Sequence, residues 1–291
     1  MTSRAGFLMV APALLGLLAF VVAPFGVALW LSLHYVNLQS TLPPRYVGLQ
    51  QYELVLADPE FRGAFYRALA NNALFALIVV PGQTALALGL ALLLNRPLRG
   101  MTVFRTIFFL PVVFPLALVA TVWKLIYSPD ELGMLNRVLR VVTFGDVGPV
   151  DWLGDGRTAL LAIAALSIWQ GAGFQMIIVL AGLQLIPADR YEAAAIDGAS
   201  AWRRFQHVTL PGLRGTLLFV ATVTTILAFQ LFDQVYLLTQ GGPGEATTTV
   251  VYQAVTAAFT ENDVGRGAAI TVLFFLVVGS VTIAQRRVAR T

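Results

Sequence analysis

The fold of this chain is decided by residues 158–185, which read TALLAIAALSIWQGAGFQMIIVLAGLQL. These 28 positions contain no charged residue. A helix needs only about 20 mostly apolar residues to cross the hydrocarbon core of a bilayer. In lipid a helix is favoured because it satisfies each backbone N–H and C=O within the segment. The stretch therefore predicts a membrane-spanning helix over 158–185.

Five further stretches have the same apolar character, and they cover residues 6–33, 71–94, 106–127, 216–239 and 268–283. The first of them is too long for the core of a signal peptide, and no small-residue cleavage site follows it. We therefore expect a permanent span there. Together the six stretches predict an all-α membrane protein, with one transmembrane domain over residues 1–291 and six transmembrane helices.

The composition agrees with a chain that is surrounded by lipid. Hydrophobic residues make up 58% and charged residues 12%, and the mean hydropathy is +0.77. Soluble domains average about 45–50% apolar residues and about 25% charged residues. The chain has no cysteine, so disulfides and thiolate chemistry are excluded. The two histidines, His34 and His207, are far apart, so no zinc site is expected. The basic residues form no stripe, which argues against nucleic-acid binding.

The distribution of charge predicts the orientation. Six spans place both termini on one side, and that side carries eleven basic residues and three acids. The opposite side carries eight basic residues and eleven acids, with Asp233 expected inside a span. Cytoplasmic loops of membrane proteins carry the excess of Lys and Arg. Both termini are therefore expected in the cytoplasm.

The loop before the fifth span is longer than a simple connection. Residues 186–215 read IPADRYEAAAIDGASAWRRFQHVTLPGLRG. A first short helix is expected here, with Asp189 and Glu192 in a capping arrangement and with Gly198 at its end. A second helix is expected over 201–207, capped by Ser200 and ended by Leu210-Pro211. Residues 187–214 thus predict an ordered cytoplasmic segment.

The order of residues in this segment resembles the EAA motif of bacterial ABC-importer permeases. That motif reads EAA, three residues, Gly, nine residues, Ile, any residue, Leu-Pro. Here Glu192-Ala193-Ala194 is followed at the same spacings by Gly198 and by Val208-Thr209-Leu210-Pro211. Val208 in place of Ile is the single departure. The position also matches, because the motif lies two spans before the C-terminus.

Two other segments resemble the carbohydrate-uptake permeases of the MalF and UgpA type. One is FDQVYLLTQGGP over 232–243, and the other is YVGLQQY over 46–52. The resemblance covers nearly the whole chain and implies the type I fold of binding-protein-dependent ABC-importer permeases. MalF carries extra N-terminal spans and a large outer loop that this chain lacks. The chain is therefore similar to the short, six-span members.

The resemblance also implies partners. These are a second permease subunit, two ATP-binding subunits and an extracellular or periplasmic substrate-binding protein, assembled in lipid at the bacterial inner membrane. This chain has no GxxxxGK phosphate loop, and its single lysine is Lys124. We therefore expect no catalytic residue, no metal site and no cofactor on this chain, with ATP and magnesium bound by the partner subunits.

The segment 187–214 is expected to couple the ATP-binding subunits to the spans. A charge-assisted contact is expected from Glu192, and a tight turn or close approach at Gly198. Arg203 and Arg204 either join this contact or simply anchor the loop on the positive side of the membrane. The expected coupling residues are Glu192, Ala193, Ala194, Asp197, Gly198, Arg203, Leu210 and Pro211.

Candidate residues for the substrate pathway lie in the fourth and fifth spans. Ser167, Gly171 and Phe174 share one helix face, where a ring can stack on a sugar and a glycine leaves room. Gln230 and Asp233 are polar residues expected inside a span, where such groups usually face the protein interior. The alternatives are ordinary small-residue packing in the fourth span and a contact of Asp233 with the partner permease.

The predicted function is the permease subunit of an ATP-driven importer for a sugar, an oligosaccharide or a related polyol. Permeases for glycerol phosphate or its diesters resemble the chain as well, so they remain an alternative. A secondary transporter usually has more spans and an ion-coupling site. A membrane enzyme would need a constellation of catalytic side chains that the spans do not show.

Overall fold

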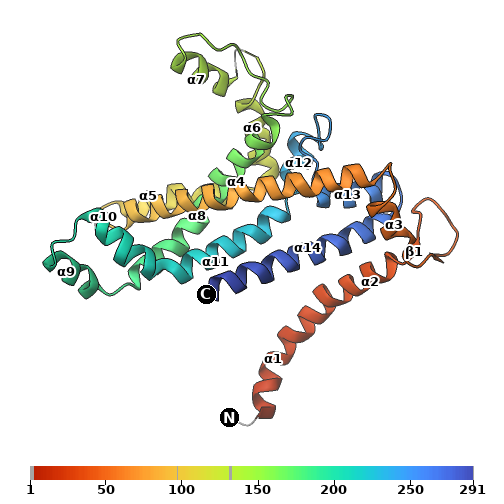
Figure 1. Cartoon of the computed structure of the whole chain (residues 1–291), viewed down its shortest axis with the longest axis horizontal. Helices are drawn as coiled ribbons and strands as arrows, with labels where there is room; N and C mark the ends of the chain where they lie inside the picture. The colour runs from red at the N-terminus through yellow and green to blue at the C-terminus, as the bar shows by residue number, and fades with distance from the viewer. Residues whose placement is uncertain (1–2, 97, 131–132, 291) are drawn as a thin grey trace. The chain divides into compact units, whose positions relative to one another are not determined.

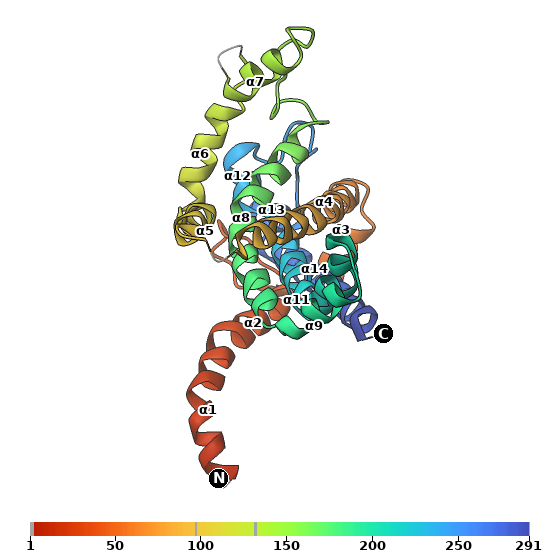
Figure 2. The same cartoon turned by 90° about the vertical axis from the view of Figure 1, so that its left-hand side faces the viewer.

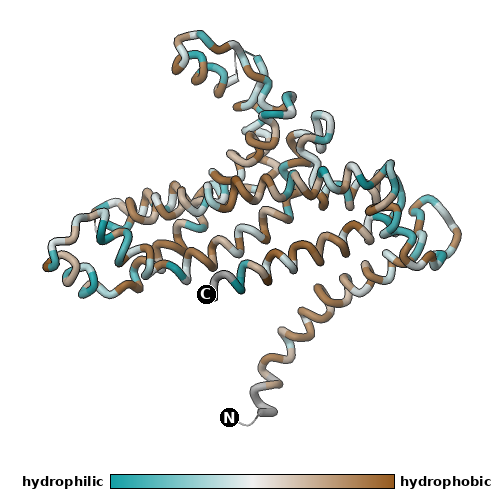
Figure 3. The backbone as a smooth tube through the Cα atoms, in the orientation of Figure 1, coloured by the Kyte–Doolittle hydropathy of each residue, from teal (hydrophilic) through white to brown (hydrophobic). Residues whose placement is uncertain are grey.

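The computed structural model describes residues 3–96, 98–130 and 133–290. Nearly all of its elements are helices (Figure 1). Five helices are long and apolar enough to cross a membrane, and a bent pair of helices forms a sixth candidate. Apolar residues run along these helices, whereas polar residues gather at their ends and in the loops (Figure 3). The all-α membrane fold expected from the apolar stretches is confirmed, and the chain is a multi-pass membrane protein.

The contacts between residues divide the chain into two compact units. The first comprises Met1–Ala68 and Val250–Gly279, and the second comprises Leu69–Thr249 and Ser280–Thr291. Two helices have residues in both units, namely α4 (Arg62–Leu94) and α14 (Val264–Arg290).

The first unit holds the N-terminal helices and a small hairpin. Its elements are α1 (Ser3–Leu17), the π-helix η1 (Leu18–Val22), α2 (Ala23–Leu31), β1 (His34–Tyr35), β2 (Arg45–Tyr46), α3 (Gln50–Leu56), α13 (Val250–Val255) and the π-helix η4 (Thr256–Thr260). The two strands pair antiparallel with His34 opposite Tyr46. Asp263 caps α14 by accepting a hydrogen bond from the backbone N–H of Arg266 at 3.0 Å.

The second unit holds the site. Its elements are α5 (Met101–Phe109), the 3-10 helix η2 (Leu110–Val113), α6 (Leu116–Ile126), α7 (Met134–Val142), α8 (Ala159–Gln184), α9 (Ala188–Ile196), α10 (Ala201–Arg204), the π-helix η3 (Phe205–Thr209), α11 (Leu210–Phe229) and α12 (Asp233–Leu238). Helix α8 is central to this unit, because it contacts α5, α11 and α12.

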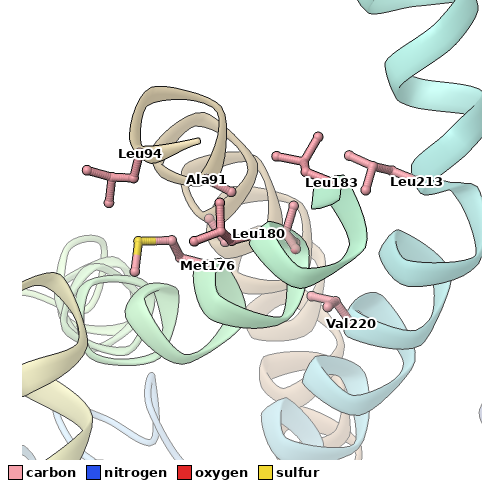
Figure 4. Packing of buried hydrophobic residues seen from close by; sticks show 9 residues of the cluster. Ala91, Leu94, Met176, Leu180, Leu183, Leu213 and Val220 are labelled. Atoms are coloured by element: carbon pink, nitrogen blue, oxygen red, sulfur yellow. The ribbon is translucent and has the colours of Figure 1, made fainter. Parts of the chain in front are cut away.

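The core of the second unit is a seam between α4, α8 and α11 (Figure 4). Helix α4 contributes small residues, Ala87 and Ala91, which are fully buried in the same cluster as Met176 and Leu180 of α8. Small residues let helix backbones approach closely, and in lipid this packing replaces the hydrophobic effect as the cause of helix association.

The third predicted span, over 106–127, is observed as two helices separated by a sharp bend. Helices α5 and α6 are bent by 97° across residues 110–115 (Figure 2). Pro111 and Pro115 lie at the bend, and Phe114 is extended with ψ 138°. A residue that precedes proline is disfavoured in the helical region, and proline donates no backbone hydrogen bond. The two prolines therefore explain the break.

The fifth predicted span is also different, because α11 ends at Phe229 and not near residue 239. Asp233, which we expected inside the span, instead begins the short helix α12. The amide of Asn72 in α4 donates to the carbonyl of Phe229 at 3.1 Å, and Thr249 Oγ1 donates to the carbonyl of Leu231 at 2.8 Å. Side chains distant in sequence thus satisfy carbonyls that the helix break releases.

The start of α11 corrects a third expectation. Leu210-Pro211 does not end a helix, because α10, η3 and α11 run as one apolar helix over Ala201–Phe229. The π-turn η3 precedes Pro211, and the N–H of Leu210 donates to the carbonyl of Phe205, five residues earlier. The wider turn accommodates a proline that has no N–H of its own. Pro24 follows the π-turn η1 in the same way.

Candidate functional site

A cavity of about 350 Å³ lies in the second unit between α4, α8, α11 and the start of α12. Four of the five predicted pathway residues line it: Ser167 and Gly171 of α8, and Gln230 and Asp233 at the break after α11. The break decides this arrangement. Because α11 stops at Phe229, Gln230 and Asp233 turn into the space beside α8 and do not continue along a helix surface.

Phe174 is the fifth predicted residue, and it does not line this cavity. It shares the helix face of Ser167, but seven residues separate the two, which is about 10 Å along the helix axis. Its side chain is 45% exposed in this chain. Helical spacing predicts a shared face for the two residues, but it does not give the position of the cavity along the helix axis.

Several lining residues were not among the predicted pathway residues. The polar ones are Gln83 of α4, Gln170 of α8, Thr224 of α11 and Gln234 of α12. Gln83 could have been identified from the sequence, because its spacing places it on the apolar stripe of α4 that continues with Ala87, Ala91 and Leu94. A polar residue on a buried stripe within a span usually faces the bundle interior.

Gln83 is a deeply buried polar residue of the lining, with 7% of its surface exposed. A Cβ atom added at Gly171 would overlap the Gln83 amide, so the amide packs directly against Gly171. Within the described part of the chain, this amide has no hydrogen-bond partner. Its polar atoms are not enclosed by the chain and open onto the cavity. The cavity beside Gln83 is thus where its partner, water or ligand, must lie.

The cavity is polar, with a single ionisable group. Among the described residues that line it, Asp233 alone carries an ionisable side chain, and amides and hydroxyls provide the other polar atoms. A group of three or more His, Cys, Asp or Glu side chains that could hold a metal ion does not occur among the residues the structure describes. The arrangement can bind a hydroxylated molecule by hydrogen bonds, and it presents no acid–base pair for chemistry.

The predicted coupling segment forms a helix, a turn and a second helix. Gly198 lies two residues after Ile196, the last residue of α9, and has φ +73°, a left-handed conformation that favours glycine. The N–H of Gly198 donates to the carbonyl of Ala195 at 3.1 Å, and the N–H of Ala199 donates to the carbonyl of Ala194 at 2.9 Å. These two bonds form a Schellman motif. The expectation that Gly198 ends the helix is confirmed.

The two expected caps of this segment have different outcomes. Ser200 caps α10 as expected, by accepting a hydrogen bond from the N–H of Arg203. Asp189 does not cap α9, because Pro187 occupies the N-cap position and Asp189 lies inside the first turn. A negative charge in the first turn still interacts favourably with the helix dipole. The hydroxyl of Tyr191 in α9 forms a hydrogen bond with the hydroxyl of Thr209 in η3, with 3.0 Å between the oxygens.

Most of the predicted coupling residues lie on the surface of this chain. Exposed among them are Glu192, Ala193, Asp197, Gly198, Arg203 and Pro211, whereas Ala194 and Leu210 are half-buried. Two apolar side chains were not predicted to belong to this surface. Ile196 is 87% exposed and Trp202 is 64% exposed. Each could have been noticed in the sequence as a large apolar residue within a mostly polar loop.

Comparison with known proteins identifies the family. Residues 83–291 match the family described as binding-protein-dependent transport system inner membrane component. The chain is 38% identical to the trehalose/maltose transport system permease protein MalF of Thermococcus litoralis, over 99% of this chain and 94% of that protein. It is 34% identical to the sulfoquinovosyl glycerol transport system permease protein SmoG of Agrobacterium fabrum, over 98% and 90%.

A solved structure has the same fold. It is that of a bacterial alginate ABC transporter in complex with an alginate pentasaccharide-bound periplasmic protein, with a TM-score of 0.81 and 20% identity, over 99% of this chain and 96% of that one. The helix arrangement described above and the match over residues 83–291 agree. The chain belongs to the family of binding-protein-dependent transport system inner membrane components.

Proposed function

We propose that this chain is the permease subunit of an ATP-driven importer and that it forms part of the pathway for a carbohydrate. The observation that supports this most strongly is the cavity that gathers Ser167, Gly171, Gln230 and Asp233 within the spans. Hydroxyl, amide and carboxylate groups match the donors and acceptors of sugar hydroxyls. The names of the relatives, which are permeases for trehalose and maltose and for sulfoquinovosyl glycerol, point to the same class of substrate.

The segment from α9 to η3 would receive the movement of the ATP-binding subunits. Its exposed Ile196 and Trp202 supply an apolar contact, and Glu192, Asp197 and Arg203 supply charges around it. An interface with apolar anchors and a charged rim is typical of specific protein contacts. Because η3 continues into α11 without a break, a displacement of this segment would reach the cavity through one helix.

The proposed assembly contains a second permease subunit, two ATP-binding subunits and an external substrate-binding protein. ATP and magnesium would be bound by the ATP-binding subunits. The membrane would be the bacterial inner membrane, with both termini in the cytoplasm. The charge distribution of the loops supports this orientation.

The test is transport by the complete complex in proteoliposomes, with radiolabelled trehalose, maltose or sulfoquinovosyl glycerol as probes. ATP-dependent uptake of at least one probe is expected. In Gly198→Trp the coupling of hydrolysis to uptake should be lost, while a pull-down with the second permease still succeeds. If the variant couples ATP hydrolysis to uptake as the wild type does, the segment is not the coupling element.

A further inference from the structure

Resting on the proposed function, we infer that Gln83 is a substrate-contacting residue and that the cavity is selective for an uncharged, polyhydroxylated molecule. Gln83 is nine-tenths buried, it lines the cavity, and within the described chain its amide lacks a hydrogen-bond partner. A buried polar group with no protein partner is satisfied by water or by a ligand. The cavity is the space from which either can reach it.

Packing alone does not explain a glutamine at this position. Gln83 stands one turn before Ala87 on the face of α4 that packs into α8, and Val79, one turn earlier, is buried as well. An apolar side chain would continue this stripe without leaving an amide unsatisfied. The amide therefore marks the level at which the apolar seam opens into the cavity.

The close approach of α4 and α8 places the Gln83 side chain against α8. Gly82, the preceding residue, lies against Ile168 of α8, and a Cβ atom at Gly82 would stand 2.9 Å from Ile168 Cδ1. One turn further along α8, Gly171 leaves the space that the Gln83 amide fills. The two glycine contacts bring α4 and α8 together at this level, so the amide lies directly against α8 at the cavity.

The chemistry of the lining indicates the substrate class. A glutamine amide offers two donors and an acceptor with two lone pairs, so it can bind a hydroxyl as donor and as acceptor. Asp233 accepts hydrogen bonds from hydroxyls and repels anions. The described lining holds no cation to offset that repulsion. Neutral sugars therefore fit this cavity, whereas carboxylated, sulfonated or phosphorylated sugars face an uncompensated negative charge.

The experiment compares three forms of the complete transport complex in proteoliposomes. They are the wild type, Gln83→Leu and Gln285→Leu. Leucine at position 83 keeps the bulk and removes the amide. Gln285 is the matched control, because its amide donates to Thr225 at 2.8 Å and does not line the cavity. Uptake of trehalose, maltose and sulfoquinovosyl glycerol is measured together with the thermal midpoint of unfolding.

The wild type should import a neutral probe in preference to sulfoquinovosyl glycerol. Gln83→Leu should lower kcat/KM for that neutral probe about tenfold, without a lower thermal midpoint, whereas Gln285→Leu should transport within about twofold of the wild type. A structural role alone would instead lower the midpoint. Gln83→Asn, which keeps an amide, should recover part of the lost uptake.

Two results would overturn the inference while leaving the proposed function intact. One is uptake by Gln83→Leu at the wild-type level. The other is a wild-type preference for sulfoquinovosyl glycerol over both neutral sugars. If the wild-type complex hydrolyses ATP and imports none of the three probes, the proposed function itself fails, and the assignment of Gln83 fails with it.

Discussion

Gly198 is placed in a left-handed conformation, and the space around the position of its missing Cβ is open within 4 Å. A side chain here therefore meets no neighbour, and its cost comes from the backbone alone. That cost is about 1–2 kcal/mol for most residues, while asparagine visits this region more easily. Gly198→Val should consequently weaken the turn after α9 far more than Gly198→Asn does.

The measurement is the number of substrate molecules imported per ATP hydrolysed by the reconstituted complex. We expect Gly198→Asn to stay near the wild-type ratio and Gly198→Val to fall well below it, with both variants still assembling. Equal ratios for the two variants would show that the left-handed turn does not contribute to coupling.

Gly171 and Gly173 lie two residues apart in α8, but a methyl group at each would meet a different obstacle. At Gly173 it would meet the backbone carbonyl of Phe108, and at Gly171 the flexible end of the Gln83 side chain. Backbone cannot move aside cheaply, and overpacking of this kind costs about 1–3 kcal/mol. Gly173→Ala should thus lower the thermal midpoint of the purified protein, and Gly171→Ala should change it less.

Fluorescence-detected gel filtration after heating would measure both midpoints in detergent. Gly171→Ala in the Gln83→Ala background should be as stable as Gln83→Ala alone, because the obstacle is gone. A larger loss of stability at residue 171 than at residue 173 would contradict the packing described for α5 and α8.

The break between α11 and α12 is stabilised by a hydrogen bond from a residue that lies outside both helices. Thr249 donates to the carbonyl of Leu231 at 2.8 Å, and both groups are buried. Thr249→Val keeps the shape and removes the hydroxyl, so it should destabilise the break by about 1–3 kcal/mol. Thr249→Ser keeps the hydroxyl and should be milder.

Limited proteolysis of the purified protein checks this expectation, with cleavage near residues 229–249 as the signal. Faster cleavage is expected for Thr249→Val than for Thr249→Ser. If valine protects this region as well as threonine does, the buried hydrogen bond does not hold the break.

The orientation of the whole molecule can be tested because the chain has no cysteine. Val142 and Ile196 are 69% and 87% exposed, and both lie at helix ends. In intact cells a membrane-impermeant maleimide should label Val142→Cys, and Ile196→Cys should react only after permeabilisation. The reverse pattern would place the N- and C-termini outside and would contradict the assignment from loop charges.

Much of the architecture could be predicted from the sequence, because the bilayer imposes strong constraints. The fourth apolar stretch, predicted over 158–185, is observed as Ala159–Gln184. Ser167 and Gly171 could be placed on one face from helical spacing alone, and they share a cavity. Gln83 could not be related to them, because the contact between α4 and α8 joins residues separated by nearly ninety positions of the chain.

The sequence by itself determined that the chain spans a membrane as helices, that a glycine turn interrupts its polar loop, and which family pattern it follows. These properties depend on local composition, spacing and backbone conformation. The tertiary structure alone decided where α11 stops, that Asp233 lies beside the cavity, and that Gln83 faces Gly171. The reason is physical, since a helix continues through an apolar stretch unless distant groups, here Asn72 and Thr249, satisfy the carbonyls that a break releases.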